Sequence, residues 1–299
     1  MTTYKDELDQ ARRALRPPED AYEQLLKRRD RKRRNRRIAA GIVALLIFGG
    51  FLFAIATLSR RNEHRPASSA CVPIPADLTH WWPADGNGAD AIGGLAATLH
   101  GNATYGPGRV GRSFMLGGDG DFVSVPDDAQ LDIGTADFTV ALWVNFASTE
   151  GEQILAEKWV QRSFDPEIVD GWTLTKLPDD HIGFAIAEGL SADSEPLDIP
   201  LGTWIHFAAR RRGEAIQILM NGEVIASRST PNREALDVTS GSSLKFGHRG
   251  APADTPGSIS DQQNYLHGRI DDVRLMIGRA LSNREIRAIV KAGTGTKRC

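Results

Sequence analysis

The feature that most constrains this chain is an apolar run, Ile38–Leu58, which has 21 residues and no charged side chain. At a rise of about 1.5 Å per residue, a helix of this length matches the roughly 30 Å hydrocarbon core of a bilayer. Nine of the eleven residues of Lys27–Arg37, directly before the run, are basic. Because basic flanks remain in the cytoplasm, we expect a single-pass cell-membrane protein with a cytoplasmic N-terminus and an extracytoplasmic C-terminal part.

Two other interpretations of this region compete with a membrane anchor. Ala54-Ile55-Ala56 resembles a signal-peptide cleavage site, but the long leader before the run argues against cleavage. A nucleic-acid-binding patch would also explain Lys27–Arg37. Its position against an apolar span favours a topology determinant in contact with anionic lipid, so no nucleic-acid partner is expected.

The charge distribution supports two compartments. Residues 1–37 hold thirteen Lys/Arg and seven Asp/Glu, whereas the residues after Leu58 hold 23 basic and 31 acidic side chains. The first segment is expected to form short helices around Pro17-Pro18, and it is too polar to bury a core. It is either a solvated stalk or a docking site for a cytoplasmic partner. Residues 59–76 contain three prolines and small polar residues, which predicts a linker.

From Asp77 to Cys299 the pattern is all-β, with short apolar runs separated by turn signals. Asp137–Phe146 alternates cleanly between apolar and other residues, and Asn221-Gly222 divides Ala215–Ala226 into a predicted hairpin. Further strands are expected at Arg112–Leu116, Asp121–Val125, Trp172–Leu177, His181–Ala187, Trp204–Arg210, Leu244–His248 and Leu266–Met276. One helix is expected at Ser282–Ala292, with a capping box at its start and Gly293 after its end. This composition predicts a single β-sandwich.

Catalytic motifs are not supported. Gly106–Gly111 matches G-x-G-x-x-G by letter, but an expected strand follows it, whereas a dinucleotide site requires a helix. The seven histidines are dispersed, and no expected strand carries the alternating acids that a glycosidase needs. We therefore expect a protein that is not an enzyme.

Tryptophans are the candidate sugar-stacking residues. Most of the six are expected in the core, and Trp143 is expected to pack rather than line a groove. Trp159 precedes Val160–Asp170, which is expected to be a polar loop, and is therefore the candidate ligand-binding residue. Cys71 and Cys299 flank the expected domain, whose ends should lie close together, so we predict a disulfide between them in an oxidising compartment. Two free or intermolecularly paired thiols are the alternative.

The acidic turn Asp85–Asp90 is a candidate metal site. It begins like a helix–loop–helix calcium loop, but Ala89 and Ala96 occupy two ligand positions. A calcium site built from Asp85, Asp90 and a distant strand stays open, as does an Asx-rich turn without metal.

Five segments together resemble laminin-G-like domains of the concanavalin A-like lectin/glucanase superfamily, in their bacterial jellyroll form. They are Leu78–Gly94, Tyr105–Val125, Phe138–Val144, Gly202–Phe207 with Met220-Asn221-Gly222, and His267–Ile286. The resemblance implies a two-sheet antiparallel jellyroll over residues 77–299, in agreement with the strand pattern. It also implies that Asp271 ligates a structural Ca²⁺, and Asp85 and Asp90 of the acidic turn are the expected further ligands. Asp272 is expected to face the opposite side of its strand, because side chains alternate.

These observations predict a membrane-anchored recognition or adhesion module that binds a glycan or another cell-surface ligand. A transmembrane sensor that signals to a cytoplasmic partner through residues 1–37 is the first alternative. A glycan-cleaving enzyme is the second, although the acidic catalytic strand of the superfamily's enzymes is not found in this sequence.

Overall fold

The computed structural model describes residues 77–164, 167–187, 189–231, 237–249 and 264–293 of the 299-residue chain. The chain divides into two compact units, Met1–Pro66 and Ala67–Cys299, and every described residue belongs to the second. Within the described ranges, no helix is long and apolar enough to span a membrane. The predicted cytoplasmic segment, span and linker (1–76) lie outside these ranges, as do Cys71 and Cys299, so these features stay predictions.

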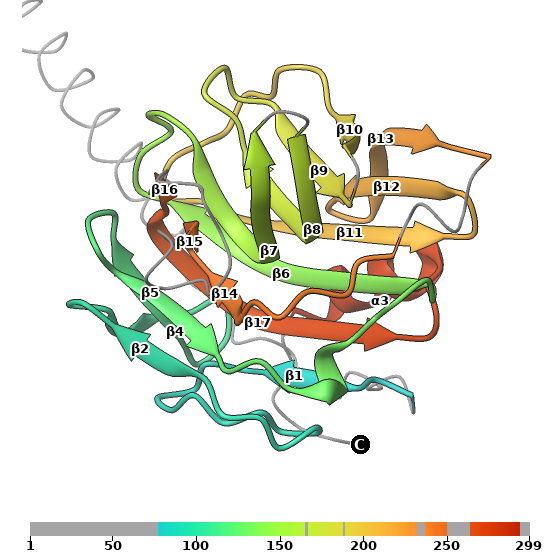
Figure 1. Ribbon diagram of the computed structural model, residues 1–299. Helices are drawn as coiled ribbons and strands as arrows, with labels where there is room; N and C mark the ends of the chain where they lie inside the picture. The colour runs from blue at the N-terminus through green and yellow to red at the C-terminus, as the bar shows by residue number, and fades with distance from the viewer. Residues whose placement is uncertain (1–76, 165–166, 188, 232–236, 250–263, 294–299) are drawn as a thin grey trace, which may run out of the picture. The chain divides into compact units, whose positions relative to one another are not determined.

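The second unit is a sandwich of two antiparallel sheets (Figure 1). The first sheet has eight strands in the order β13 (Glu223–Ser229), β12 (Ala215–Met220), β11 (Trp204–Arg212), β6 (Phe138–Phe146), β17 (His267–Ile277), β4 (Arg112–Gly117) and β3 (Thr104–Pro107), with β1 (His80–Trp82) also paired to β17. The second has seven strands in the order β10 (Leu190–Asp193), β9 (Ile182–Ile186), β8 (Glu167–Lys176), β7 (Gln153–Phe164), β14 (Leu244–Phe246), β5 (Phe122–Val125) and β2 (Thr98–His100). A ribbon of β15 (His248–Arg249) and β16 (Asn264–Tyr265) and a 3₁₀ turn, η1 (Ala129–Leu131), complete the strand-rich part. The predicted all-β jellyroll is confirmed.

The core lies between the two sheets and follows from strand alternation. On β6 the side chains of Phe138, Val140, Leu142, Val144 and Phe146 are all buried in it. Facing residues of the second sheet, such as Trp172 and Phe184, pack against Phe138 with ring centroids 5.9 and 6.0 Å away. The alternate residues of β6 therefore point to the outer face of the first sheet.

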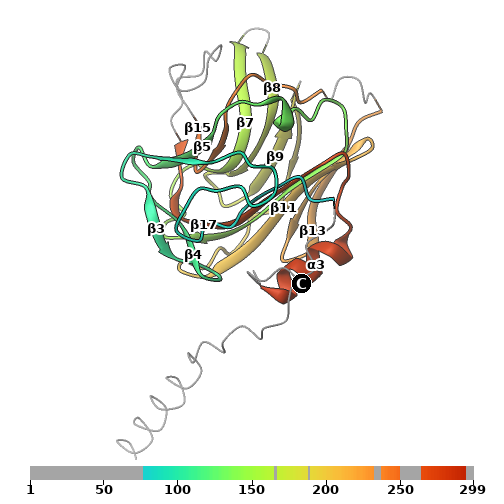
Figure 2. The ribbon, with the colours of Figure 1, turned by 90° about the horizontal axis from the view of Figure 1, so that it is seen from below.

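The one α-helix in the described ranges, α3 (Asn283–Ala292), covers part of that outer face (Figure 2). Its Ile286 and Ile289 pack with Ala141 of β6 and Ala208 of β11. Ser282 caps the helix through the predicted capping box with Glu285. The helix does not cover the rest of this outer face.

The prediction of a loop at Val160–Asp170 is wrong, because most of it belongs to the paired strands β7 and β8. The charged residues of β7 interrupt the apolar pattern by which a strand is predicted from the sequence. Lys158 is buried, and its ammonium group donates to Asp127 Oδ1 at 2.7 Å and to the Ser240 carbonyl oxygen. Because its ammonium group is hydrogen-bonded, the burial of Lys158 lowers the stability of the fold little.

The last strand contains an irregularity that alternation cannot anticipate. The register of β17 against β6 shifts between Asp271 and Arg274, and Asp272 has a φ of 56°. Asp271 accepts hydrogen bonds from the Arg109 and Val110 amides, and Asp272 accepts one from the Trp81 indole. The expectation that the two acids face opposite ways is therefore wrong, because the bulge turns both carboxylates to the outer face.

Candidate functional site

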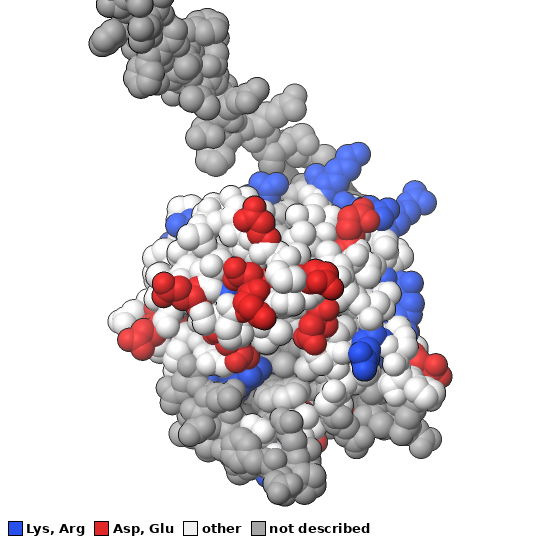
Figure 3. Space-filling model, turned by 90° about the horizontal axis from the view of Figure 1, so that it is seen from above, with Lys and Arg blue, Asp and Glu red and all other residues white. Residues whose placement is uncertain are grey.

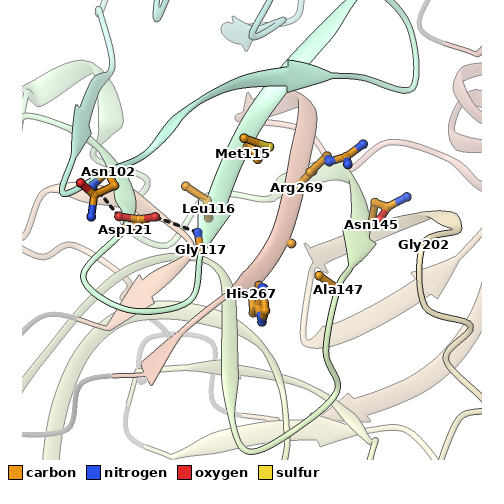
Figure 4. A pocket seen from close by; sticks show the side chains of 11 residues that line it. Asn102, Met115, Leu116, Gly117, Asp121, Asn145, Ala147, Gly202, His267 and Arg269 are labelled. Carbon is orange, nitrogen blue, oxygen red and sulfur yellow. Dashed lines mark hydrogen bonds between the residues drawn. The ribbon is translucent and has the colours of Figure 1, made fainter.

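A pocket of about 470 Å³ opens on the first sheet, at the ends of β4 and β6 and the start of β17 (Figure 4). This volume lies within the range of small-molecule sites. Its lining is contributed by strands and turns that are far apart in the sequence: Asn102, Met115, Leu116, Gly117, Asp121, Asn145, Ala147, Gly202, His267, Gly268 and Arg269.

Strand register places the polar lining residues. Arg269 of β17 is the Cα partner of Met115 on β4 and of Asn145 on β6, so the three residues form one row across the sheet. His267 is paired with Gly117 two residues away on the same strands. Because the step is two residues, His267 projects from the same face as the row.

Two of the residues that line the pocket, Gly117 and Gly268, are glycines with close neighbours. A Cβ atom on Gly268 would lie 2.3 Å from the Asn145 carbonyl oxygen, and one on Gly117 would lie 2.8 Å from Asp121 Oδ2. Neither position could carry a larger residue without displacing its neighbour. Gly268 therefore allows the backbones of β17 and β6 to approach closely, and Gly117 leaves room for the Asp121 carboxylate.

Asn145 and Arg269 have unused hydrogen-bonding capacity. The Asn145 side chain is only 7% exposed, and its amide forms no hydrogen bond with any residue in the described ranges. Among the described residues, the Arg269 guanidinium donates only to the Pro107 carbonyl oxygen, at 3.3 Å. At the other end, Asp121 already accepts from the Asn102 and Gly117 amides at 2.5 and 2.8 Å. The free donors and acceptors therefore gather at the Asn145–Arg269 end.

The predicted ligand-binding residue Trp159 lies elsewhere, on β7 of the second sheet. It is half-buried, and the Arg249 guanidinium lies 5.9 Å from its ring centroid. Arg249 also joins two acids, with Nη1 2.9 Å from Glu152 Oε1 and Nε 3.3 Å from Glu157 Oε2. Burial raises the pKa of Glu157, and Arg249 and Lys245 act against this rise. Arg249 thus contacts the Trp159 ring and forms ion pairs with both acids.

The three predicted calcium ligands do not form one group. Among the described residues, no set of three or more His, Cys, Asp or Glu side chains is arranged to hold a metal ion. Asp85 and Asp271 do approach each other through the turn before β4: Asp85 Oδ1 accepts from the Arg112 amide at 2.9 Å, and Asp271 Oδ2 accepts from the Arg109 amide at 2.7 Å. Burial, Asp272 and Asp85 together raise the pKa of Asp271 to about 8.

Asp90 has a different environment. Its Oδ1 accepts from the backbone amides of Trp81, Ile92 and Gly93, and its Oδ2 lies 2.7 Å from His80 Nδ1. These bonds hold the pKa of the carboxyl below its usual value even though burial acts against them. The structure therefore gives Asp90 a turn-stabilising position, whereas calcium binding at Asp85 and Asp271, completed by backbone carbonyl oxygens, stays a prediction that fits their clustered charge.

Comparisons with solved structures bear on the fold. Domain 4 of AbnA, a GH43 extracellular arabinanase from Geobacillus stearothermophilus solved with arabinotriose, is similar with a TM-score of 0.52 and 18% identity, over 72% of this chain and 98% of that one. The binding domain of botulinum neurotoxin DC, solved with SialylT, gives 0.50 and 15% over 70% and 49%. A Trypanosoma rangeli sialidase gives 0.56 and 14% over 82% and 40%, so this chain spans less than half of it.

A search of curated proteins found no match. The Laminin_G_3 family model, described as the concanavalin A-like lectin/glucanases superfamily, matches residues 116–287, which is more than half of the 299 residues. The matched range runs from the end of β4 to α3 and includes most of the pocket lining. The chain therefore belongs to the Laminin_G_3 family of the concanavalin A-like lectin/glucanases superfamily.

Proposed function

We propose that this protein is a glycan-binding module and that a sugar unit enters the pocket beside Asn145. The observation that carries the proposal is Asn145, a residue only 7% exposed that borders the pocket and whose side-chain amide has no hydrogen-bond partner among the described residues. The amide therefore has free hydrogen-bonding capacity on the side of the pocket, where a sugar hydroxyl group would replace solvent as its partner.

The chemistry of the lining suits a sugar. Asn145 and Asn102 each offer an amide oxygen and an NH₂ group, and His267 and Arg269 add further polar contacts. Met115 is 38% exposed and supplies an apolar surface for the C–H groups of a ring. A few placed polar groups around an apolar surface are typical of small-ligand sites.

Two of the structurally similar proteins add support through the ligands with which they were solved. One was solved with arabinotriose and another with SialylT, so related folds hold carbohydrate ligands. Their identity to this chain is at most 18%, so the ligand of this protein has to be argued from its own residues.

Binding without cleavage fits the lining better than hydrolysis does. Asp121 is the only carboxylate among the described residues of the pocket, and both its oxygens accept backbone hydrogen bonds. Glycosidases generally need two carboxyl groups beside the scissile bond. The Glu152–Glu157 pair lies on the other sheet and is held by Arg249. We therefore infer a non-catalytic module, with anchoring through residues 38–58 as part of the proposal.

A glycan array tests this function. The full chain should bind a limited set of glycans, and Asn145→Ala should weaken that binding at least tenfold. Asn87→Ala is the matched control, because Asn87 is exposed in the turn after β1 and lies outside the lining. Circular dichroism checks that both variants fold. Binding that Asn145→Ala leaves unchanged would place the site elsewhere, and hydrolysis of a bound glycan would favour the enzyme alternative.

A further inference from the structure

We propose that this pocket selects sugars that carry a carboxylate, and that Arg269 binds the carboxylate. The inference rests on the proposed glycan-binding function and names its ligand class. It starts from a contrast between Arg269 and two other arginines, Arg249 and Arg274. No ion pair joins Arg269 to an acid in the described part of the chain, whereas Arg249 is paired with Glu152 and Arg274 with Asp272.

The guanidinium has donors to spare. Its one hydrogen bond to a residue that the structure describes, from Nη1 to the Pro107 carbonyl oxygen, is long at 3.3 Å. The planar group presents five N–H donors in a fork that matches the two oxygens of a carboxylate. A half-buried guanidinium that borders a pocket and lacks an acidic partner is well suited to an anionic ligand.

The acids near the pocket do not supply that partner. Asp121 lies at the opposite end, beyond Met115 and Leu116, and is bonded to the Asn102 and Gly117 amides (Figure 4). Asp271, two residues from Arg269, gives its Oδ2 to the Arg109 and Val110 amides. Neither carboxylate neutralises Arg269 by direct contact.

The row across the sheet fixes how such a sugar would be oriented. Asn145 and Met115 flank Arg269 on the neighbouring strands. A carboxylate bound to Arg269 would leave ring hydroxyls for the Asn145 amide and a C–H face for Met115. Seen from above, the acidic side chains of the visible face gather in its middle and the basic ones lie near its margin (Figure 3). Such a face repels an acidic ligand.

Matched sugar pairs test the proposal on the full chain by calorimetric titration. The pairs are glucuronate with glucose, galacturonate with galactose, and mannuronate with mannose, in which only the group at C6 differs. In at least one pair the uronate should bind at least tenfold more tightly. That preference should shrink in high salt, because salt screens the charge on a partly exposed guanidinium.

Substitution identifies the residue responsible. Arg269→Gln should reduce the preference to less than twofold and weaken binding of the uronate far more than binding of the neutral sugar, and Arg269→Lys should retain part of the preference. Arg112→Gln is the control, because it removes the same charge from β4 at a residue outside the lining. Equal binding of both members of every pair, or a preference that survives Arg269→Gln, would overturn the proposal while the glycan-binding function stands. Absence of binding to all six sugars would also overturn the carboxylate proposal, and absence of binding to every glycan on the array as well would overturn the glycan-binding function with it.

Discussion

The indole nitrogen of Trp81 donates a hydrogen bond to Asp272 Oδ1 at 2.5 Å and so joins residues 191 positions apart. Trp81 lies on β1 and Asp272 at the bulge of β17, so the bond reinforces the pairing of these two strands. Arg274 completes the group, with Nη2 2.9 Å from Asp272 Oδ2 and its guanidinium 5.3 Å from the Trp81 ring centroid. The first and last strands of the domain are thus held together by a buried polar group as well as by the sheet.

We expect Trp81→Phe to lower the free energy of unfolding by about 1–3 kcal/mol beyond the cost of the smaller ring, because Asp272 loses a buried donor. Trp143→Phe is the matched control: Trp143 is also buried, but its indole nitrogen has no hydrogen-bond partner among the described residues. Urea denaturation of both variants measures the difference. Equal losses would show that the Trp81–Asp272 bond adds nothing to stability.

Calcium should stabilise the domain through Asp85 and Asp271. The ion would offset the charge that these acids and Asp272 bring together, and its binding would raise the free energy of unfolding by about 2.7 kcal/mol at a concentration 100-fold above Kd. Melting curves of the full chain in calcium and then in chelator test this. Asp271→Ala should abolish the difference, whereas Asp119→Ala, at an exposed turn residue, should preserve it. A midpoint that does not respond to calcium would end the prediction.

Acid should destabilise the protein through His206. This side chain is buried against Trp143, and burial lowers its pKa to about 3, with a further contribution from Arg274. Between about pH 6.5 and pH 3 the unfolded chain therefore binds a proton that the folded chain does not. The His206 contribution to the free energy of unfolding should therefore fall with decreasing pH by up to about 1.4 kcal/mol per pH unit in this window, and the raised pKa of Asp271 opposes it in the total slope.

Urea denaturation at pH 7, 6 and 5 measures that slope, and His206→Gln should reduce it. Asp90 has a lowered pKa as well, but as a carboxyl its contribution is lost only at lower pH. A variant with the wild-type slope over this interval would show that His206 is not the group responsible.

Elements specified by local patterns were predictable from the sequence. The alternation of β6, the Asn221-Gly222 hairpin and the capped helix α3 each depend on neighbouring residues, and each lies where it was expected. Strand β7 was not predictable, because the partners that satisfy Lys158 are supplied by distant segments.

The candidate site was even less accessible to sequence reasoning. Met115, Asn145 and Arg269 meet only through the register of three strands separated by long stretches of chain. The one local signal was a polar Asn145 between two core residues of β6. Register and bulges are set by tertiary packing, which a pattern within one strand does not contain.

The central claim is that a glycan binds at the Asn145 pocket, and the Asn145 side-chain amide resonance tests it most directly. On titration of isotope-labelled full chain with the glycan that binds most tightly on the array, this NH₂ signal should shift saturably while that of Asn87 stays in place. A shift of the Trp159 indole signal on the opposite sheet, with Asn145 unmoved, would contradict the account.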